Sequence, residues 1–258
     1  MKTPISDIID RYTILMLKME QIDNYLPPKE AKKEKPFLKK EIDLYKEAIK
    51  DFRKEGVQVE NEWINGLYKI NAKCQEMESD IRREMGKALS KEKLKKVGRS
   101  ATLLPKFNKQ RIAIKNEIAK KHNIRSKRVQ MPLAELIDRF TILKLKNERV
   151  NDLTPDQIAN EKPFLKKELA LYKRAIDGFR RHGIKIKKEW IEKLYDNNRR
   201  AWDMESALRH EKEKKFGLEE FGRRAIKLRH MNIERIAIKN EIAEKSKSGF
   251  KEVKIFLK

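Results

Sequence analysis

The sequence is poor in the residues that make cross-links, tight turns and membrane spans. Its 258 residues include one cysteine, nine glycines and eight prolines. A single cysteine excludes an intramolecular disulfide and any metal site built from several thiolates. Scarce glycine and proline argue against a turn-rich β-sandwich. No apolar run approaches the roughly 18–20 residues of a membrane helix, and no signal-peptide pattern opens the sequence. We therefore expect a cytoplasmic protein without a membrane partner.

Charge is abundant and unbalanced. The chain has 64 Lys and Arg against 40 Asp and Glu, a formal net charge of +24, while hydrophobic residues still make up 39%. A charge of this size attracts nucleic acid or another polyanion. No recognition helix, zinc finger or RNA-recognition motif is present, so we expect contacts to phosphates rather than to base edges. The alternative is a solvated, lysine-rich helical surface without such a partner.

Three sequence blocks occur twice, at an offset that drifts from 128 to 124 residues. Because insertions and deletions are tolerated in loops, the drift marks loops. We predict an all-α protein of two tandem homologous bundles of about four helices each, with repeats at 1–124 and 131–246, a basic linker at 125–130 and a tail at 247–258. The paired blocks are Ile9–Lys18 with Ile137–Lys146, Glu34–Glu41 with Glu161–Glu168, and Arg111–Ala119 with Arg235–Ala243.

Apolar residues spaced by three and four, together with residues that start and stop helices, define the expected helices. We place Thr3 as the cap and Pro4 as the first residue of the opening helix. Gly56 and Gly183 should end the second helices, and Pro105 should break the fourth helix of the first repeat. The expected ranges are about 36–54 and 163–182 for the second helices, 60–89 and 187–215 for the third, and 107–122 and 219–245 for the fourth. The residues from 250 to 258 alternate in polarity and form either a short strand or a loose tail.

Polar residues interrupt the most apolar helix of each repeat. The first helix carries Asp10, Arg11 and Thr13 among apolar residues on most of its circumference. Buried charge must be paired or solvated. We therefore predict that Asp10 and Arg11, like Asp138 and Arg139, are largely buried. Their predicted contacts are the fourth-helix pairs Arg111/Lys115 and Arg235/Lys239, or Glu78 and Glu205 on the third helix.

Two interpretations of these residues stay open: an internal polar network, or a pocket for an anionic group, since arginine suits carboxylate and phosphate oxygens. The candidate anion ligands are Arg11, Arg82, Arg111, Lys115, Arg139, Arg209, Arg235 and Lys239. The supporting polar residues are Asp10, Thr13, Asn71, Glu78, Asp138, Thr141, Asn198 and Glu205.

Signals for catalysis are weak. None of the four histidines has a counterpart in the other repeat, and Cys74 aligns with Ala201. No Gly-rich phosphate loop or nucleophile elbow is present. We predict no catalytic residue, no metal site and no cofactor.

The repeated blocks resemble an uncharacterised family of small all-helical proteins of bacteria and tailed phages. The resemblance implies an all-helical fold in a bacterial cytoplasm, or in the host cytoplasm for a phage protein, and implies no activity. Ser79 and Ser206 replace the family's second acid, which weakens a shared metal-site idea. The residues that match its motifs are Ile9–Lys18, Asn71, Glu78, Arg82, Asn108, Arg111 and Lys115, and in the second copy Ile137–Lys146, Asn198, Glu205, Arg209, Asn232, Arg235 and Lys239.

Three functions follow from these observations. The leading one is a non-enzymatic protein whose basic surface engages nucleic acid through phosphates. The first alternative is a pocket that sequesters or hydrolyses a phosphorylated small molecule or nucleotide. The second is a structural or partner-binding protein. The sequence predicts no particular oligomeric state.

Overall fold

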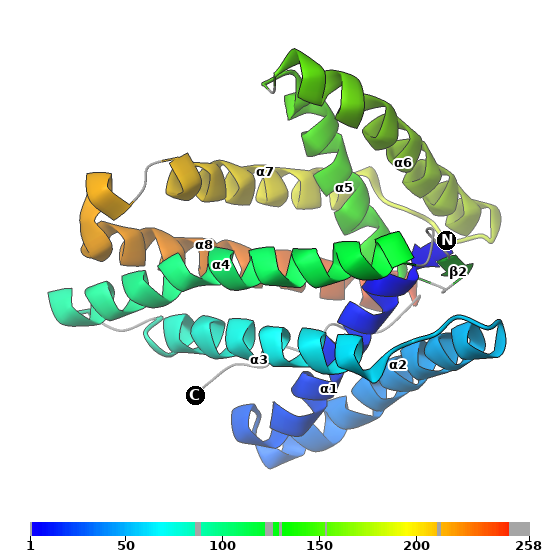
Figure 1. Cartoon of the computed structure of the whole chain (residues 1–258), viewed down its shortest axis with the longest axis horizontal. Coiled ribbons are helices and arrows are strands. Elements are labelled where there is room, and N and C mark those ends of the chain that lie inside the picture. The colour runs from blue at the N-terminus through cyan, green and yellow to red at the C-terminus, as the bar shows by residue number, and fades with distance from the viewer. Residues whose placement is uncertain are drawn as a thin grey trace. The chain divides into compact units, whose positions relative to one another are not determined.

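The structure, a computed structural model, describes residues 2–85, 89–121, 126–128, 131–152, 154–210 and 213–247. In these ranges the chain forms eight α-helices, so the predicted all-α class is confirmed (Figure 1). The helices are α1 (Ile5–Tyr25), α2 (Pro28–Lys54), α3 (Asn61–Arg83), α4 (Lys91–Lys121), α5 (Leu133–Arg149), α6 (Pro155–Arg181), α7 (Lys188–His210) and α8 (Glu213–Ser246), with a 3₁₀ turn, η1 (Val150–Asp152). The predicted tail from residue 250 lies outside the described residues. Among the described helices, none combines the length and apolar character needed to cross a bilayer.

Two three-residue strands add a small ribbon that the sequence patterns did not predict. β1 (Lys2–Pro4) pairs antiparallel with β2 (Ser126–Arg128), which lies in the predicted linker. The placement of Thr3 as a helix cap is therefore wrong. Thr3 belongs to β1, and Pro4 occupies the cap position without a side-chain hydrogen bond.

The described chain divides into two compact units. The N-terminal unit contains residues 2–129 and 208–229, and the C-terminal unit contains residues 130–207 and 230–252, as far as these are described. Helix α8 contributes its first part to the N-terminal unit and its second part to the C-terminal unit. The units are defined by packing and differ in this segment from the repeats, which are defined by sequence.

Each unit has its own apolar core. In the N-terminal unit α1 contacts α2, α3 and α4, which fits a helix that is apolar around most of its circumference. Its buried residues include Ile9, Phe52 and Leu67. In the C-terminal unit, Ile137 and Trp190 are buried at the centre of the corresponding cluster.

The helix boundaries differ from the predictions mainly at prolines. Helices α2 and α6 begin eight residues earlier than expected and include Pro36 and Pro163. Helix α4 continues through Pro105, so the predicted break is wrong. Proline removes one backbone hydrogen bond, but apolar residues buried on both sides, such as Leu104 and Ile118, hold the two parts of α4 in place. Gly56, at φ +76°, follows α2 as predicted.

Two glycines bring helix backbones together in the N-terminal unit. A Cβ on Gly98 of α4 would lie 2.2 Å from the backbone oxygen of Leu218, and one on Gly222 of α8 would lie 2.1 Å from that of Leu94. Gly98 and Gly222, like Leu94 and Leu218, occupy equivalent positions of the two repeats at the offset of 124. The close approach is therefore reciprocal between equivalent segments.

Candidate functional site

A buried carboxylate anchors a polar network between α1, α3 and α4. Asp10 is almost fully buried, and its Oδ1 lies 3.1 Å from Nε of Arg111 while its Oδ2 lies 3.8 Å from Nζ of Lys115. The Asn71 amide donates hydrogen bonds to Asp10 Oδ1 (3.1 Å) and to Thr13 Oγ1 (3.0 Å). The Thr13 hydroxyl in turn donates to the Asp10 backbone oxygen. The network ties three helices together around one charge.

The aspartate, asparagine, threonine and lysine of this network recur between α5, α7 and α8. Asp138 is buried, and Asn198 donates to Asp138 Oδ1 and to Thr141 Oγ1, each at 2.9 Å. Thr141 donates to the Asp138 backbone oxygen at 2.7 Å, and Nζ of Lys239 lies 3.9 Å from Asp138 Oδ2. Equivalent residues thus make equivalent bonds in the two halves of the chain.

A second acid, one turn before each buried aspartate, completes the charge pairing. Nζ of Lys115 lies 2.5 Å from Asp7 Oδ1, and Nζ of Lys239 lies 2.8 Å from Glu135 Oε2. Glu135 also pairs with Arg139 at 3.0 Å. The sequence analysis missed Asp7 and Glu135. Both lie three residues before the aspartate and are acidic in both repeats, which was the signal that could have found them.

Glu78 forms a separate ion-pair cluster on α3. Its carboxylate lies 2.8 Å from Arg82 Nη2 and 3.0 Å from Nη1 of Arg229 on α8. Burial disfavours the charged form of Glu78, but Arg229 and Arg82 outweigh burial and lower its pKa below the usual value. Arg229 aligns with Pro105 in the other repeat, so no repeat signal could have identified it.

The remaining candidate ligands are less enclosed than predicted. Arg11 and Arg139 are half-buried rather than largely buried. Arg139 donates a hydrogen bond to Glu135 of its own helix, because the i, i+4 spacing brings the two side chains together on α5. Arg235 and Glu205 are also half-buried on α8 and α7. The side chain of Arg209 lies outside the described part of the chain.

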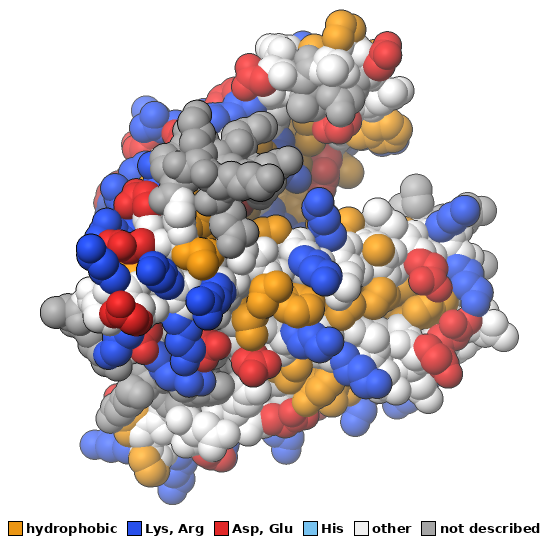
Figure 2. All heavy atoms as spheres, turned by 60° about the vertical axis from the view of Figure 1, so that its left-hand side comes forward, with side chains coloured by type: hydrophobic (Ala, Val, Ile, Leu, Met, Phe, Trp, Pro, Cys, Tyr) orange, Lys and Arg blue, Asp and Glu red, His pale blue; other side chains and the backbone are white. Residues whose placement is uncertain are grey.

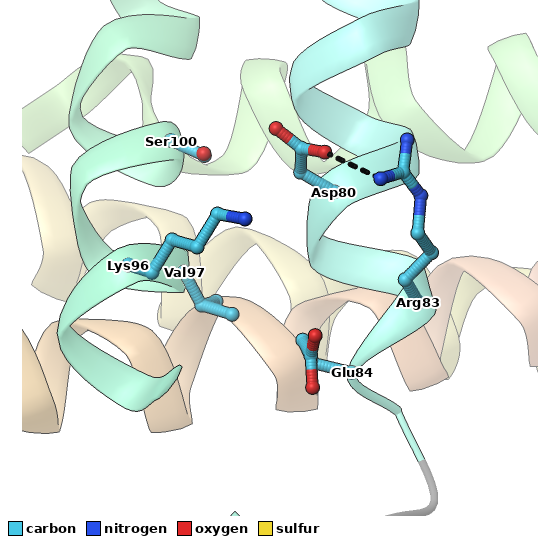
Figure 3. Close-up of a pocket in the computed structure, with 6 residues that line it drawn as sticks. All are labelled: Asp80, Arg83, Glu84, Lys96, Val97 and Ser100. Atoms are coloured by element: carbon cyan, nitrogen blue, oxygen red, sulfur yellow. Dashed lines mark ion pairs between the residues drawn. The ribbon is translucent and has the colours of Figure 1, made fainter. Parts of the chain in front are cut away.

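Figure 3 shows a small pocket between α3 and α4, lined by Asp80, Arg83, Glu84, Lys96, Val97 and Ser100. Asp80 and Arg83 form an ion pair of 3.4 Å at its rim. The pocket volume of about 20 Å³ holds one water molecule and no nucleotide. In the described ranges, no three His, Cys, Asp or Glu residues group so that they could hold a metal ion.

Cys74 is a packed residue of α3. It is buried among Ile81, Val97 and Ala101, and its thiol lies 4.0 Å from Asn108 Oδ1. Burial raises the pKa of the Cys74 thiol, and nearby Arg111 offsets only part of this effect. A thiol with a raised pKa is a poor nucleophile at neutral pH.

Helix α4 carries a larger net positive charge than the other described helices. It contains eleven Lys and Arg against two acids, a net charge of +9 over 31 residues. Arg111 and Lys115 face inward and pair with the aspartates. Six further basic residues are exposed and spaced by 3, 4, 7 or 11 positions, which places them along one side of the helix. We call this side the α4 outer face; its residues are Lys91, Lys95, Arg99, Lys106, Lys109 and Lys120.

Basic side chains are also spread across the surface drawn in Figure 2, with acidic and apolar groups between them. Many exposed cations of the described chain pair with acids of their own helix, as Arg180 does with Asp177 at 2.6 Å and Lys193 with Glu189 at 2.6 Å. Such exposed pairs lower the local field, whereas the sequence of α4 supplies few acids to its own cations. The positive potential should therefore be strongest along α4.

Comparisons of this chain with protein-family models, with curated proteins and with solved structures give no match.

Proposed function

We propose that this protein binds nucleic acid without catalysing a reaction, through contacts between the α4 outer face and phosphate groups, and with little sequence specificity. The net charge of +9 on α4 is the observation that carries the proposal. At 1.5 Å per residue, the face from Lys91 to Lys120 is about 43 Å long, which corresponds to about a dozen base pairs of a duplex.

The internal networks support this role by separating the cations of α4 into two groups. Asp7 and Asp10 neutralise Arg111 and Lys115 and fasten α4 to α1. The outer cations lie on the opposite side of a helix whose orientation is fixed by those inner bonds. A rigid row of cations loses less conformational entropy on binding a polyanion than a flexible tail does.

The test is binding to a non-specific duplex and to a single strand across a salt series. If six phosphates are contacted, the logarithm of the association constant should fall with the logarithm of salt concentration with a slope of about −5, or roughly a 10³-fold loss of affinity between 50 and 200 mM. No binding at low salt would contradict the proposal.

A triple variant locates the contact. Lys95→Gln, Arg99→Gln and Lys106→Gln together should reduce the steepness of the salt slope by about 2 to 3. The matched control removes the same charge at Arg180, Lys193 and Arg223, which pair with acids of their own helices. An equal loss in both variants would mean that net charge alone, and not the α4 outer face, determines binding.

A pocket for a phosphorylated small molecule is the second candidate. Its support is the grouping of Arg111 and Lys115 of α4 around Asp10 and the position of Lys239 of α8 beside Asp138. It is the weaker candidate because Arg111, Lys115 and Lys239 already pair with carboxylates of the chain. A thermal-shift screen of nucleotides and sugar phosphates separates the pocket from the nucleic-acid surface. A small molecule that binds the folded protein raises its melting temperature, and one that does not bind leaves it unchanged. If neither assay gives a response, a structural or partner-binding role is left.

We also infer that the chain arose by tandem duplication of one helical bundle. The recurrence of the Asp10 network at Asp138 and the reciprocal approach at Gly98 and Gly222 support this inference. A nucleic-acid partner would place the protein in a compartment that contains nucleic acid, the cytoplasm expected from the sequence.

A further inference from the structure

The longest helices outside α4 and α8 carry an identical octapeptide. Glu34–Glu41 on α2 and Glu161–Glu168 on α6 have the same eight residues, although the residues on either side differ between the repeats. Part of this identity serves the core, since Leu38 is buried and Leu165 packs on the core of the C-terminal unit.

The phenylalanine of the octapeptide does not serve the core. Phe37 is 41% exposed and Phe164 is 74% exposed. A large aromatic side chain in water adds little to folding, because the hydrophobic contribution depends on the apolar area removed from water. An aromatic ring at the same exposed position in both repeats is therefore accessible to a partner.

Exposed lysines lie about one helical turn from each ring in the sequence. Lys33 and Lys40 lie four residues before and three residues after Phe37, so they share its side of α2, and both are exposed. Lys167 is in the same place relative to Phe164 on α6 and is exposed too. Each ring is therefore flanked by a cation about one helical turn away.

We propose that the two octapeptides are binding sites for single-stranded nucleic acid, with a base stacked on Phe37 or Phe164 and the neighbouring phosphates on Lys33, Lys40 or Lys167. An exposed ring beside lysines provides the combination that single strands use, a π surface for a base and positive charge for the backbone. A duplex keeps its bases inside the stack and offers these rings only phosphates. The inference rests on the proposed function and adds a preference for single strands to it.

The test compares a short oligothymidine with a duplex of the same length, bound to the full chain at one salt concentration. The double variant Phe37→Leu/Phe164→Leu keeps apolar bulk and helix propensity but removes the π surface. Its affinity for the single strand should fall by roughly 5- to 150-fold for each stacked base. Its affinity for the duplex and its salt slope should remain those of the unchanged protein, because no phosphate contact is removed. Phe37→Trp/Phe164→Trp should retain or strengthen single-strand binding.

Each alternative has its own outcome. Unchanged single-strand binding in the Leu variant would overturn the stacking sites while leaving the proposed function intact, provided the unchanged protein binds with a steep salt dependence. Absence of binding by the unchanged protein at low salt would instead reject the proposed function. Binding to anionic phosphatidylserine vesicles that the Leu variant retains and an Ala variant loses would assign the rings to a membrane surface and overturn the proposal. The Leu and Trp variants keep a large apolar side chain at both positions and should keep the melting temperature of the parent.

Discussion

At the residue scale, the stability of the fold depends on how a few buried charges are paired. Asp10 is buried and accepts a hydrogen bond from Asn71 while it pairs with Arg111. The net stabilisation from a buried ion pair is small, because both charges lose their hydration. Removing one partner is costly, because the other charge then stays buried without compensation. Substitution of Asp10 is therefore a sensitive test of the network.

We expect Asp10→Ala to lower the free energy of unfolding by roughly 2–4 kcal/mol, because it leaves Arg111 and Asn71 without their shared acceptor. Urea unfolding measures the change. The matched control is Asp23→Ala, which breaks an exposed pair with Lys35 and should cost about 0–1 kcal/mol. Equal effects of the two substitutions would argue against a buried network.

The lowered pKa of Glu78 makes the stability of the protein depend on pH. Its pKa is lower in the folded protein than the usual 4.5, despite burial, because of Arg229 and Arg82. Its stabilising contribution is therefore complete above about pH 4.5 and is lost as the pH falls through the folded-state pKa. Between pH 6 and pH 3, the parent should lose more unfolding free energy than Glu78→Gln does. The difference should shrink in an Arg229→Gln background, and parallel pH profiles in both backgrounds would contradict this assignment.

At the element scale, the approach of α4 to the first part of α8 depends on two glycines. Gly98→Ala or Gly222→Ala would bring a methyl carbon to within 2.2 Å of a backbone oxygen, so the helices must move apart. Each substitution should cost about 1–3 kcal/mol or more in thermal or urea unfolding.

The control for this prediction is Gly178→Ala, a helical position of α6 where the nearest atom to the added carbon is 3.9 Å away. There alanine should be neutral or stabilise the protein by up to about 1 kcal/mol, because it favours the helix. If all three substitutions behave alike, helix propensity and not close packing governs the α4–α8 approach.

At the scale of the whole molecule, the excess of positive charge sets the response to salt. With a net charge of +24, the folded chain repels itself, and salt screens this repulsion over a Debye length of about 10 Å at 0.1 M. The melting temperature of the free protein should therefore rise between 20 and 300 mM NaCl, whereas nucleic-acid affinity should fall. The triple Gln variant of the α4 outer face should show a smaller rise. A melting temperature that falls with salt would show that the surface ion pairs, not the net charge, dominate.

The sequence by itself determined the helical class and the central residues of the buried networks. Periodic apolar residues are a local property of the chain, and a polar residue on an otherwise apolar helix must find a partner wherever the helix is buried. Asp10, Thr13 and Asn71 were identified in this way, and each recurs in the second repeat with the same bonds.

Only the tertiary structure decided the contacts across helices that local sequence signals do not predict. The continuity of α4 through Pro105 depends on packing along its whole length, since the local preference of proline is to end a helix. The pairing of Arg229 with Glu78 and the reciprocal approach at Gly98 and Gly222 join segments more than a hundred residues apart. The exposure of Phe37 and Phe164 is of the same kind: sequence spacing puts them beside the apolar side of a helix, but only the neighbouring helices determine whether that side is covered.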